Sequence, residues 1–326
     1  MNNIELQDLE MRSGSDIDSQ NDANAAVEES KELVLNISQN KRCEKFISRT
    51  GSVVNDLFRY AVIIEYLGSS FAGSQVQPGQ KTIQSEIEAV LNVLTGLEIK
   101  TVFAGRTDKG VHAKGQVAHF DLPFEIDTYR FIHSLNAILP ADISIMSIKQ
   151  VERDFHSQKS ARYRWYRYTI NNRQQRSSWF NNALHIRQKL DMESMNKALS
   201  YLIGKHDFSS FKSSNSCNPA KECMIYRAEC TCLEDAGIIY MDLIADRFLY
   251  NMIRIIVGTL IRIGKGSFPP EYMLEVLEAK DRTKAGPTAR PEGLVLMSVG
   301  YSEKYNINDE LNKEAIKNEN LFCKAS

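Results

Sequence analysis

The sequence predicts an α+β protein with a mixed, mainly antiparallel sheet. Stretches with the period of strands and stretches with the period of helices follow one another irregularly, and several strand candidates are separated only by a turn. A doubly wound parallel sheet would need a helical crossover between successive strands, so this order argues against one. The chain has 326 residues, 43% apolar and 25% charged, which is the composition of a globular protein with a sizeable core.

The expected elements of the N-terminal part begin at about residue 57. Thr82 is placed to cap a helix whose apolar residues recur at helical spacing, and Gly96 is placed to end it. We expect strands at 57–68, 98–105, 115–122, 143–151 and 161–171, and helices at 82–96 and 128–140. The two strands before and after 105–114 are therefore joined by a short, charged loop.

The C-terminal part continues the mixture of helices and hairpins. Asp191 is placed to cap its first helix, and Gly237 lies in the turn of a hairpin. We expect helices at 191–204, 248–264 and 270–280, and strands at 223–234, 237–246 and 293–301. The chain then divides into a half at 57–160 and a half at 161–305, flanked by residues 1–56 and a tail at 306–326.

The charge of the chain is uneven. Residues 1–40 contain nine acidic and two basic residues, a net of −7 out of a total of −1, which leaves +6 on the rest. We expect residues 1–56 to form a disordered, acidic extension without an essential role. No apolar run is long enough to span a membrane. The absence of a secretory signal, and the acidity of the N-terminal region, indicate a cytoplasmic protein with reduced thiols.

Four of the six cysteines lie close together in the sequence without a C-x-x-C pair. They are either zinc ligands or, on the simpler interpretation, buried small hydrophobic residues. These residues are Cys217, Cys223, Cys230 and Cys232.

A basic, aromatic stretch spans residues 153–176, with seven Lys or Arg residues and one acidic residue. Side chains alternate between the faces of a strand, so one face would present Arg162, Arg164, Tyr166 and Tyr168. Guanidinium groups bind phosphates and aromatic rings stack on unpaired bases, which indicates an RNA-binding face. The alternative is a solvated face with aromatic residues packed beneath it.

The loop AGRTDKGVHAKG, at 104–115, concentrates charge between two strands. An Asp before Lys-Gly is a common turn sequence, but a carboxylate flanked by cations also stays ionised and can act as a nucleophile. Asp108 fits both interpretations. His112 is either a general base or a structural histidine, and no Ser-His-Asp or Cys-His arrangement is evident.

The helix expected at 248–264 carries one polar stripe on an otherwise apolar surface. The stripe consists of Arg247, Asn251, Arg254, Gly258 and Arg262. It faces either solvent or a cleft. In a cleft Arg254 would need a carboxylate partner, and Asp108 is a candidate.

The motif around Asp108 closely resembles the G-R-T-D-x-G-V-H-A signature of the TruA family of tRNA pseudouridine synthases. Further stretches resemble the family's first motif and its later segments in the right order, so that the resemblance covers about residues 58 to 303. These stretches are 66–78, 154–170, 204–211, 248–264 and 279–301. One departure is Ser74, where bacterial relatives usually carry Trp.

The resemblance implies a fold and a reaction. It implies two ferredoxin-like halves that share one sheet, with a basic central cleft. The reaction would be the isomerisation of uridine to pseudouridine at positions 38, 39 and 40 in the anticodon stem-loop of tRNAs. It would proceed without a cofactor or metal, in a homodimer whose two subunits contact one tRNA. Neither a dinucleotide-binding fingerprint nor a P-loop occurs in the sequence.

Two catalytic residues follow from the resemblance. Asp108, in the half at 57–160, would be the nucleophile, and Arg254 would form the buried ion pair that keeps it ionised and oriented. Attack at ribose C1′, proton abstraction at C2′ to give a glycal, and attack at uracil C6 all stay open.

Five residues are expected to bind the substrate. Arg106 would fill or steady the gap that the flipped base leaves, and Tyr166 would stack on the flipped uracil and could help to move a proton. Leu294 would pack beside that base. Arg162 and Arg164 would contact the RNA backbone.

Three alternatives remain. The chain could modify another RNA position, or it could bind or fold tRNA without catalysis. A hydrolytic use of Asp108 would need a second carboxylate at a defined spacing, and none is identifiable. The joint presence of Asp108, Arg106, Tyr166 and Arg254 argues against the loss of catalysis.

Overall fold

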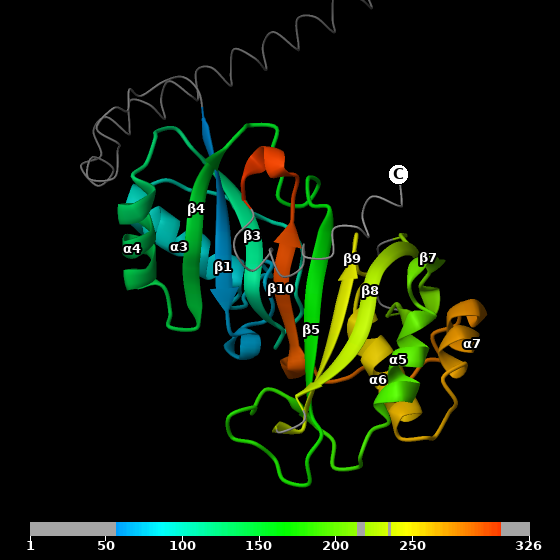
Figure 1. Cartoon of the computed structure of the whole chain (residues 1–326). Coiled ribbons are helices and arrows are strands. Elements are labelled where there is room, and N and C mark those ends of the chain that lie inside the picture. The colour runs from blue at the N-terminus through cyan, green and yellow to red at the C-terminus, as the bar shows by residue number, and fades with distance from the viewer. Residues whose placement is uncertain (1–56, 214–218, 234–235, 308–326) are drawn as a thin grey trace, which may run out of the picture.

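The computed structural model describes residues 57–213, 219–233 and 236–307 of the chain. The extension expected at 1–56, and residues 308–326 of the expected tail, lie outside the described residues. Figure 1 shows one twisted sheet with helices packed against it. In the part of the chain that the structure describes, no helix is long and apolar enough to cross a membrane.

The first half of the described chain has the order βαββαβ. Its elements are β1 (Phe58–Tyr66), α3 (Ile83–Thr95), β2 (Val102–Phe103), β3 (His112–Leu122), α4 (Thr128–Ile138) and β4 (Ile143–Val151). Thr82 caps α3 as predicted, since its hydroxyl accepts the Ser85 N–H at 3.1 Å. Gly96 ends the helix in the left-handed conformation, at φ 75°.

The second half contains the same six elements and three additions, β6, β7 and α7. In chain order it comprises β5 (Tyr163–Asn171), β6 (Leu184–His185), α5 (Met192–Ser200), β7 (Gly204–Asp207), β8 (Glu222–Leu233), β9 (Ile238–Ala245), α6 (Met252–Gly264), α7 (Tyr272–Ala279) and β10 (Leu294–Gly300). Asp191 caps α5 as predicted. The helix predicted from residue 248 begins only at Met252, because Asn251 has a left-handed backbone, at φ 61°, that a helix cannot contain.

Each half contributes four strands of the same topology to one sheet, and the two sets of strands lie side by side. The strand order is β4-β1-β3-β10-β5-β9-β8-β7, with β2 paired to β3 and β6 paired to β5. Numbered within its own half, each set of four strands lies in the order 4-1-3-2, and all pairs inside a set are antiparallel. Strands β3 and β10 join the sets in parallel, so the sets have the same orientation. The predicted pair of ferredoxin-like halves in one mainly antiparallel sheet is confirmed.

One edge of strand β3 pairs with two different strands. Strand β1 occupies the other edge along almost its whole length. On the divided edge, β10 pairs only with His112 and Ala113, whereas β2 pairs only with Ala118 and His119. The loop 104–111, which connects β2 to β3, lies where the ladder between these partners is interrupted.

Helix α6 is crossed closely by the segment at 285–289. A Cβ atom on Gly258 would lie 1.7 Å from the Pro287 carbonyl oxygen, so only glycine permits this crossing. The Gly286 N–H donates to Thr259 Oγ1 at 2.8 Å, and the Ala289 N–H donates to the Arg254 carbonyl at 3.0 Å. The crossing thereby fixes the backbone beside Arg254.

Candidate active site

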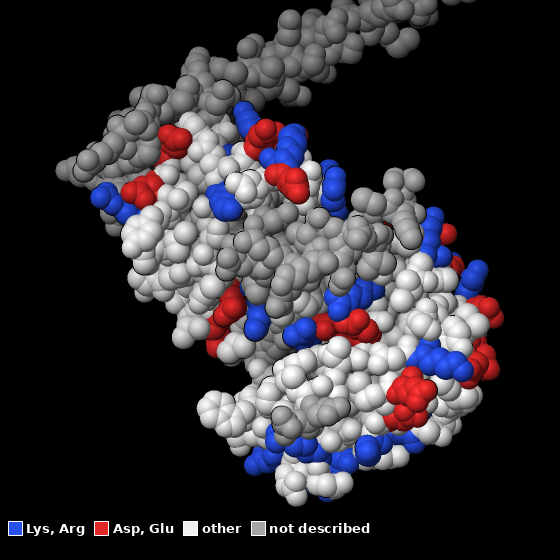
Figure 2. Space-filling model, viewed as in Figure 1, with Lys and Arg blue, Asp and Glu red and all other residues white. Residues whose placement is uncertain are grey.

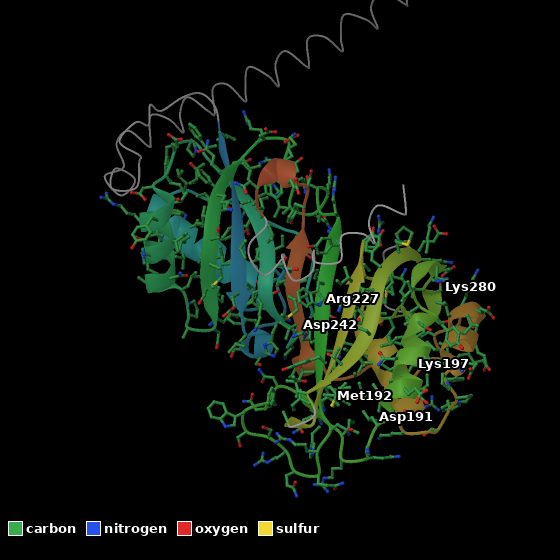
Figure 3. All side chains as sticks on the ribbon, in the orientation of Figure 1. Asp191, Met192, Lys197, Arg227, Asp242 and Lys280 are labelled. Atoms are coloured by element: carbon green, nitrogen blue, oxygen red, sulfur yellow. The ribbon has the colours of Figure 1, made fainter. Side chains whose placement is uncertain are left out.

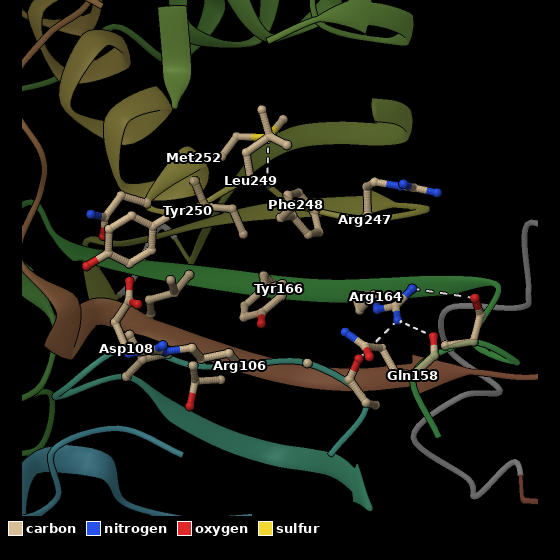
Figure 4. A pocket seen from close by; sticks show the side chains of 18 of the residues that line it. Arg106, Asp108, Gln158, Arg164, Tyr166, Arg247, Phe248, Leu249, Tyr250 and Met252 are labelled. Carbon is tan, nitrogen blue, oxygen red and sulfur yellow. Dashed lines mark hydrogen bonds between the residues drawn. The ribbon is translucent and has the colours of Figure 1, made fainter. Parts of the chain in front are cut away.

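A pocket of about 660 Å³ lies between the two halves, a volume typical of ligand sites at ~300–1,000 Å³. Its walls come from the loop after β2, from β5 and the segment before it, and from the residues that lead into α6 (Figure 4). Five lining side chains are basic and two are acidic. They are Arg106, Lys159, Arg164, Arg247 and Arg254, with Asp108 and Asp246. The lining therefore has an excess of positive charge, which suits an anionic ligand.

The loop that carries Asp108 is held by a buried polar network. Ser74 Oγ accepts the Thr107 N–H at 2.8 Å, and the Ser74 N–H donates to the Thr107 carbonyl at 3.1 Å. Thr107 Oγ1 shares a hydrogen bond of 2.7 Å with the Tyr66 hydroxyl, and Gln116 Nε2 donates to the Gly105 carbonyl at 2.9 Å. Both backbone groups of the residue before the aspartate are thus fixed by a segment from before α3.

Asp108 and Arg254 are brought together from different halves. Arg254 Nη1 lies 3.5 Å from Asp108 Oδ2, and the side chains are 17% and 21% exposed. Arg254 Nε donates to the Ala289 carbonyl and Nη1 donates to Asn251 Oδ1, both at 2.8 Å. The guanidinium is therefore oriented by its own surroundings. It meets the carboxylate through one nitrogen, Nη1.

Burial raises the pKa of the Asp108 carboxyl above its ordinary value, although the charges of Arg254 and Arg106 act in the opposite direction. The carboxylate is consequently a stronger base than an exposed aspartate. Loss of a neighbouring cation would raise this pKa further.

The Tyr166 ring lies in the middle of the pocket, with Asp108 and Arg106 toward one end and Arg164 toward the other (Figure 4). It packs edge-to-face against Phe248, with ring centroids 5.3 Å apart. Burial raises the pKa of the Tyr166 hydroxyl, so the phenol stays protonated near neutral pH. Among the described residues no hydrogen-bond partner is seen for this hydroxyl.

The three predicted arginines occupy different environments. Arg106 is exposed and lines the pocket beside Asp108. Arg164 also lines the pocket, but its guanidinium donates to four carbonyl groups, those of Ala104, Gln158, Ala161 and Asp246, at 2.6 to 3.4 Å. Arg162 is exposed and does not line the pocket. Leu294, at the start of β10, is 6% exposed and lines the pocket as well.

A second hollow, of about 510 Å³, adjoins the first and shares Arg106, Asp108, Tyr250 and Arg254 with it. The ion pair therefore lies between two cavities rather than at the bottom of one. The sequence did not single out Tyr250 or Phe248, which precede α6. Their aromatic character beside the polar stripe of that helix was the only available signal.

His112 does not line the larger pocket. It is 3% exposed, and its Nδ1 accepts the Gly68 N–H at 3.0 Å, which favours the structural interpretation. Cys223 and Cys230 are buried, as the simpler interpretation of the cysteines expects, Cys232 is exposed, and Cys217 lies outside the described residues. Within the described ranges, no three His, Cys, Asp or Glu side chains are grouped so as to hold a metal ion.

Comparison with known proteins identifies the family. The chain is 44% identical over 248 residues to tRNA pseudouridine synthase A of Moorella thermoacetica, covering 74% of this chain and 98% of the relative. The chain belongs to the tRNA pseudouridine synthase A family. It is also 41% identical over 252 residues to the Ehrlichia canis member, covering 74% of this chain and 100% of that relative. The resemblance read from the motifs is thereby confirmed.

A family model described as tRNA pseudouridine synthase matches residues 198–302, within the second half. A model of an uncharacterised bacterial protein family matches residues 98–216. Membership of the tRNA pseudouridine synthase A family makes this chain an enzyme of the isomerase class. A crystal structure of a Cbf5-Nop10-Gar1 complex covers 79% of this chain and 65% of its own at 9% identity, but its TM-score of 0.30 is too low to support any conclusion.

Proposed function

We propose that this chain converts uridine to pseudouridine at positions 38, 39 and 40 in the anticodon stem-loop of tRNAs, with Asp108 as the nucleophile. The observation that carries the proposal is the Asp108–Arg254 pair, 3.5 Å apart between two cavities of a chain from this family. The reaction breaks the bond from ribose C1′ to uracil N1 and makes a bond from C1′ to C5. The proton that leaves C5 is balanced by one gained at N1.

The target base has to leave its stack before it can reach Asp108. Extrusion of a base costs roughly a few kcal/mol. Tyr166 and Leu294 offset part of this cost by packing on the uracil, because both line the pocket. Arg106, exposed beside the carboxylate, is placed to occupy the gap in the stem. Since burial raises the pKa of Tyr166, its hydroxyl stays protonated and does not serve as a general base.

Asp108 acts as the ionised carboxylate in all three routes to the product. A preorganised cation stabilises charge better than water does, because it needs no reorientation during the reaction. Arg254 supplies such a charge, held by the Ala289 carbonyl and the Asn251 side chain.

The remaining parts of the proposal concern the RNA and the assembly. The half at 57–160 supplies the nucleophile and the half at 161–305 supplies its counter-ion. Arg162 contacts the RNA backbone from the rim, whereas Arg164 positions the segments that form the pocket wall. The active form is a cytoplasmic homodimer whose two subunits contact one tRNA.

The decisive experiment measures tritium release from unmodified tRNA transcripts labelled at uracil C5. The wild-type chain should release tritium, and Asp108→Ala should reduce release by ~10⁴-fold or more. Retained tRNA binding by Asp108→Ala would show that the variant folds. Mapping of the modified sites would test positions 38, 39 and 40, and sedimentation would test the homodimer.

Other outcomes would select the alternatives. Release from other sites would assign the chain to another RNA position. Tight tRNA binding without release by the wild type would favour a binding or folding role, and would leave the Asp108 loop as a charged turn.

A further inference from the structure

The loop at 172–190, between β5 and α5, differs in composition from the rest of the surface. It contains four Lys or Arg residues and no Asp or Glu, together with six Asn or Gln residues. The basic residues are Arg173, Arg176, Arg187 and Lys189. We call residues 172–190 the basic loop. It hangs from the lower end of β5 in Figure 1, and Figure 2 shows Lys and Arg side chains gathered along that lower edge.

The tip of the basic loop presents a tryptophan to solvent. Trp179 is 95% exposed, whereas Trp165, the second tryptophan of the chain, is 6% exposed. Among the described residues Trp179 is the most exposed of the large hydrophobic side chains. It offers a flat ring on which a base can stack.

The basic loop is tied down rather than loose. Asn172 Nδ2 donates to the carbonyls of Ile186 and Gln188, both at 2.8 Å, and Asn172 Oδ1 accepts the Leu190 N–H at 3.0 Å. At the tip, the Phe180 N–H donates to Ser177 Oγ at 3.2 Å. The loop therefore displays its cations and its indole from a fixed base, which lowers the entropy that a ligand must overcome.

The cations of the basic loop are available for a ligand. Arg176, Arg187 and Lys189 are exposed, and within the described residues none of them forms an ion pair. The loop contributes no lining residue to the pocket that holds Asp108. Strand β5 runs from Tyr166 in that pocket to Asn171 at the base of the loop, a distance of roughly 16 Å at ~3.3 Å per residue. Residues 179–183 of the loop line a separate hollow of about 200 Å³, together with Thr169 and Val295.

We propose that the basic loop is a second RNA-binding surface, separate from the pocket, that holds the substrate by its phosphates and stacks an unpaired base on Trp179. The proposal rests on the proposed function, because it takes the bound RNA to be the substrate. Phosphate binding explains the cations and the absence of acidic residues. The amide side chains can bond both to phosphate and to base edges. A protein partner is the less favoured occupant, because four Lys or Arg residues without an acidic residue complement the uniform negative charge of an RNA backbone.

The first test removes charge. Arg176→Ala/Arg187→Ala is compared with Lys197→Ala/Lys280→Ala, which removes the same net charge from α5 and from the end of α7, on the right-hand flank in Figure 3. The dissociation constant of an unmodified full-length tRNA transcript is measured over a range of salt concentrations. The loop variant should bind about tenfold more weakly and should lower the salt slope by about 1.4 to 1.8, for two phosphate contacts. The control pair should change both quantities much less.

The second test concerns the indole. Trp179→Ala should weaken binding about tenfold, while Trp179→Phe should retain most of the affinity because a ring remains. Because Trp165 is buried, quenching of tryptophan fluorescence by RNA should disappear in Trp179→Phe. Release of tritium at saturating tRNA should stay within about twofold of wild type in all loop variants.

These readouts separate the two proposals. If wild type releases no tritium, the proposed function fails, whatever the loop variants do. Unchanged affinity, salt slope and quenching in the loop variants, with normal turnover, would overturn the RNA-binding surface alone. A change of sedimentation coefficient without a change of tRNA affinity would assign the basic loop to a contact between proteins, and would also overturn it.

Discussion

The two halves of the molecule share one topology but use the same connection in opposite ways. In the first half, the link from the second to the third strand is the loop 104–111, which carries Asp108. In the second half, the equivalent link joins β8 to β9 as a plain hairpin. Strand β2 has two residues, whereas β8 has twelve.

The difference shows where this fold has room for a site. When the second strand of a half is paired along its whole length, it occupies the edge of the third strand, and the turn between the two strands lies at the end of the sheet. Shortening β2 frees part of the edge of β3, admits β10, and leaves the following loop between the two halves. The loop that carries Asp108 therefore lies where β2 is short, and hydrogen bonds from side chains hold it instead of a strand ladder.

Among the changes that test this comparison, breaking the contact between the halves should have the largest effect. Arg254→Lys keeps the charge but loses the planar group that Ala289 and Asn251 orient, and a misplacement of about 1 Å can cost ~100-fold in rate. Tritium release by a folded variant would measure this loss. Near-normal turnover in Arg254→Lys would remove the ion pair from the mechanism.

Arg254→Gln adds a test by pH. The proposed reaction needs the ionised form of Asp108, so the rate should rise with pH through the pKa of this carboxyl, which burial places above its ordinary value. Removal of the cation raises that pKa further, so the acid limb of kcat/KM should move to higher pH in Arg254→Gln and move less in Arg254→Lys. An unmoved limb in Arg254→Gln would show that a different group titrates.

A smaller loss is expected when the support of the loop is weakened. Ser74→Ala leaves the buried N–H of Thr107 without an acceptor, at a cost of about 1–3 kcal/mol. We expect kcat to fall about tenfold, with KM for tRNA within twofold. Ser85→Ala is the matched control, because it removes a hydroxyl from the cap of α3 at a cost of ~1 kcal/mol. Equal kcat in both variants would make Ser74 a residue of stability alone.

The smallest effect distinguishes two neighbouring arginines. Arg162→Ala should weaken tRNA binding only a few-fold and flatten its salt slope by about 0.7 to 0.9, as for one phosphate contact. Arg164→Ala should leave the salt slope of tRNA binding unchanged and lower the free energy of unfolding by about 2 kcal/mol, because the Arg164 guanidinium donates hydrogen bonds to backbone carbonyl groups. Salt-dependent binding and thermal unfolding of both variants check this, and equal slopes for the two would contradict it.

Local patterns predicted most of the elements. The strand at 143–151 and the caps Thr82 and Asp191 follow from nearest neighbours in the chain, and the structure confirms them. Strand β2 was expected at 98–105 but spans only two residues, because the edge it would use is partly taken by β10 from the far end of the chain. Such competition between distant segments leaves no trace in a local pattern.

Local patterns also predicted part of the candidate site. Alternation along β5 placed Arg164 and Tyr166 on one face, and both line the pocket. Alternation cannot say what fills the space above a side chain, and the carbonyl groups around Arg164 come from four separate positions. The motif resemblance marks Ser74 as a departure from Trp, and the Ser74 hydroxyl accepts the Thr107 N–H. An indole has no acceptor for the Thr107 N–H, so this chain anchors its loop in a way that such a residue could not.

The twelve-residue β8 also determines how many sets of four strands the sheet contains. The two sets of four strands have the same orientation, so they are arranged head-to-tail. Further sets could be added to such an arrangement without limit unless one edge is blocked. A third unit could add its last strand to β9 only if that edge were open, as the edge of β3 is open to β10. Strand β8 covers it from end to end, and β7 lies beyond. The pairing of β8 with β9 leaves the second half without a counterpart of the loop 104–111. The same pairing prevents a third set of strands from joining β9, and so protects the sheet from growth into a filament.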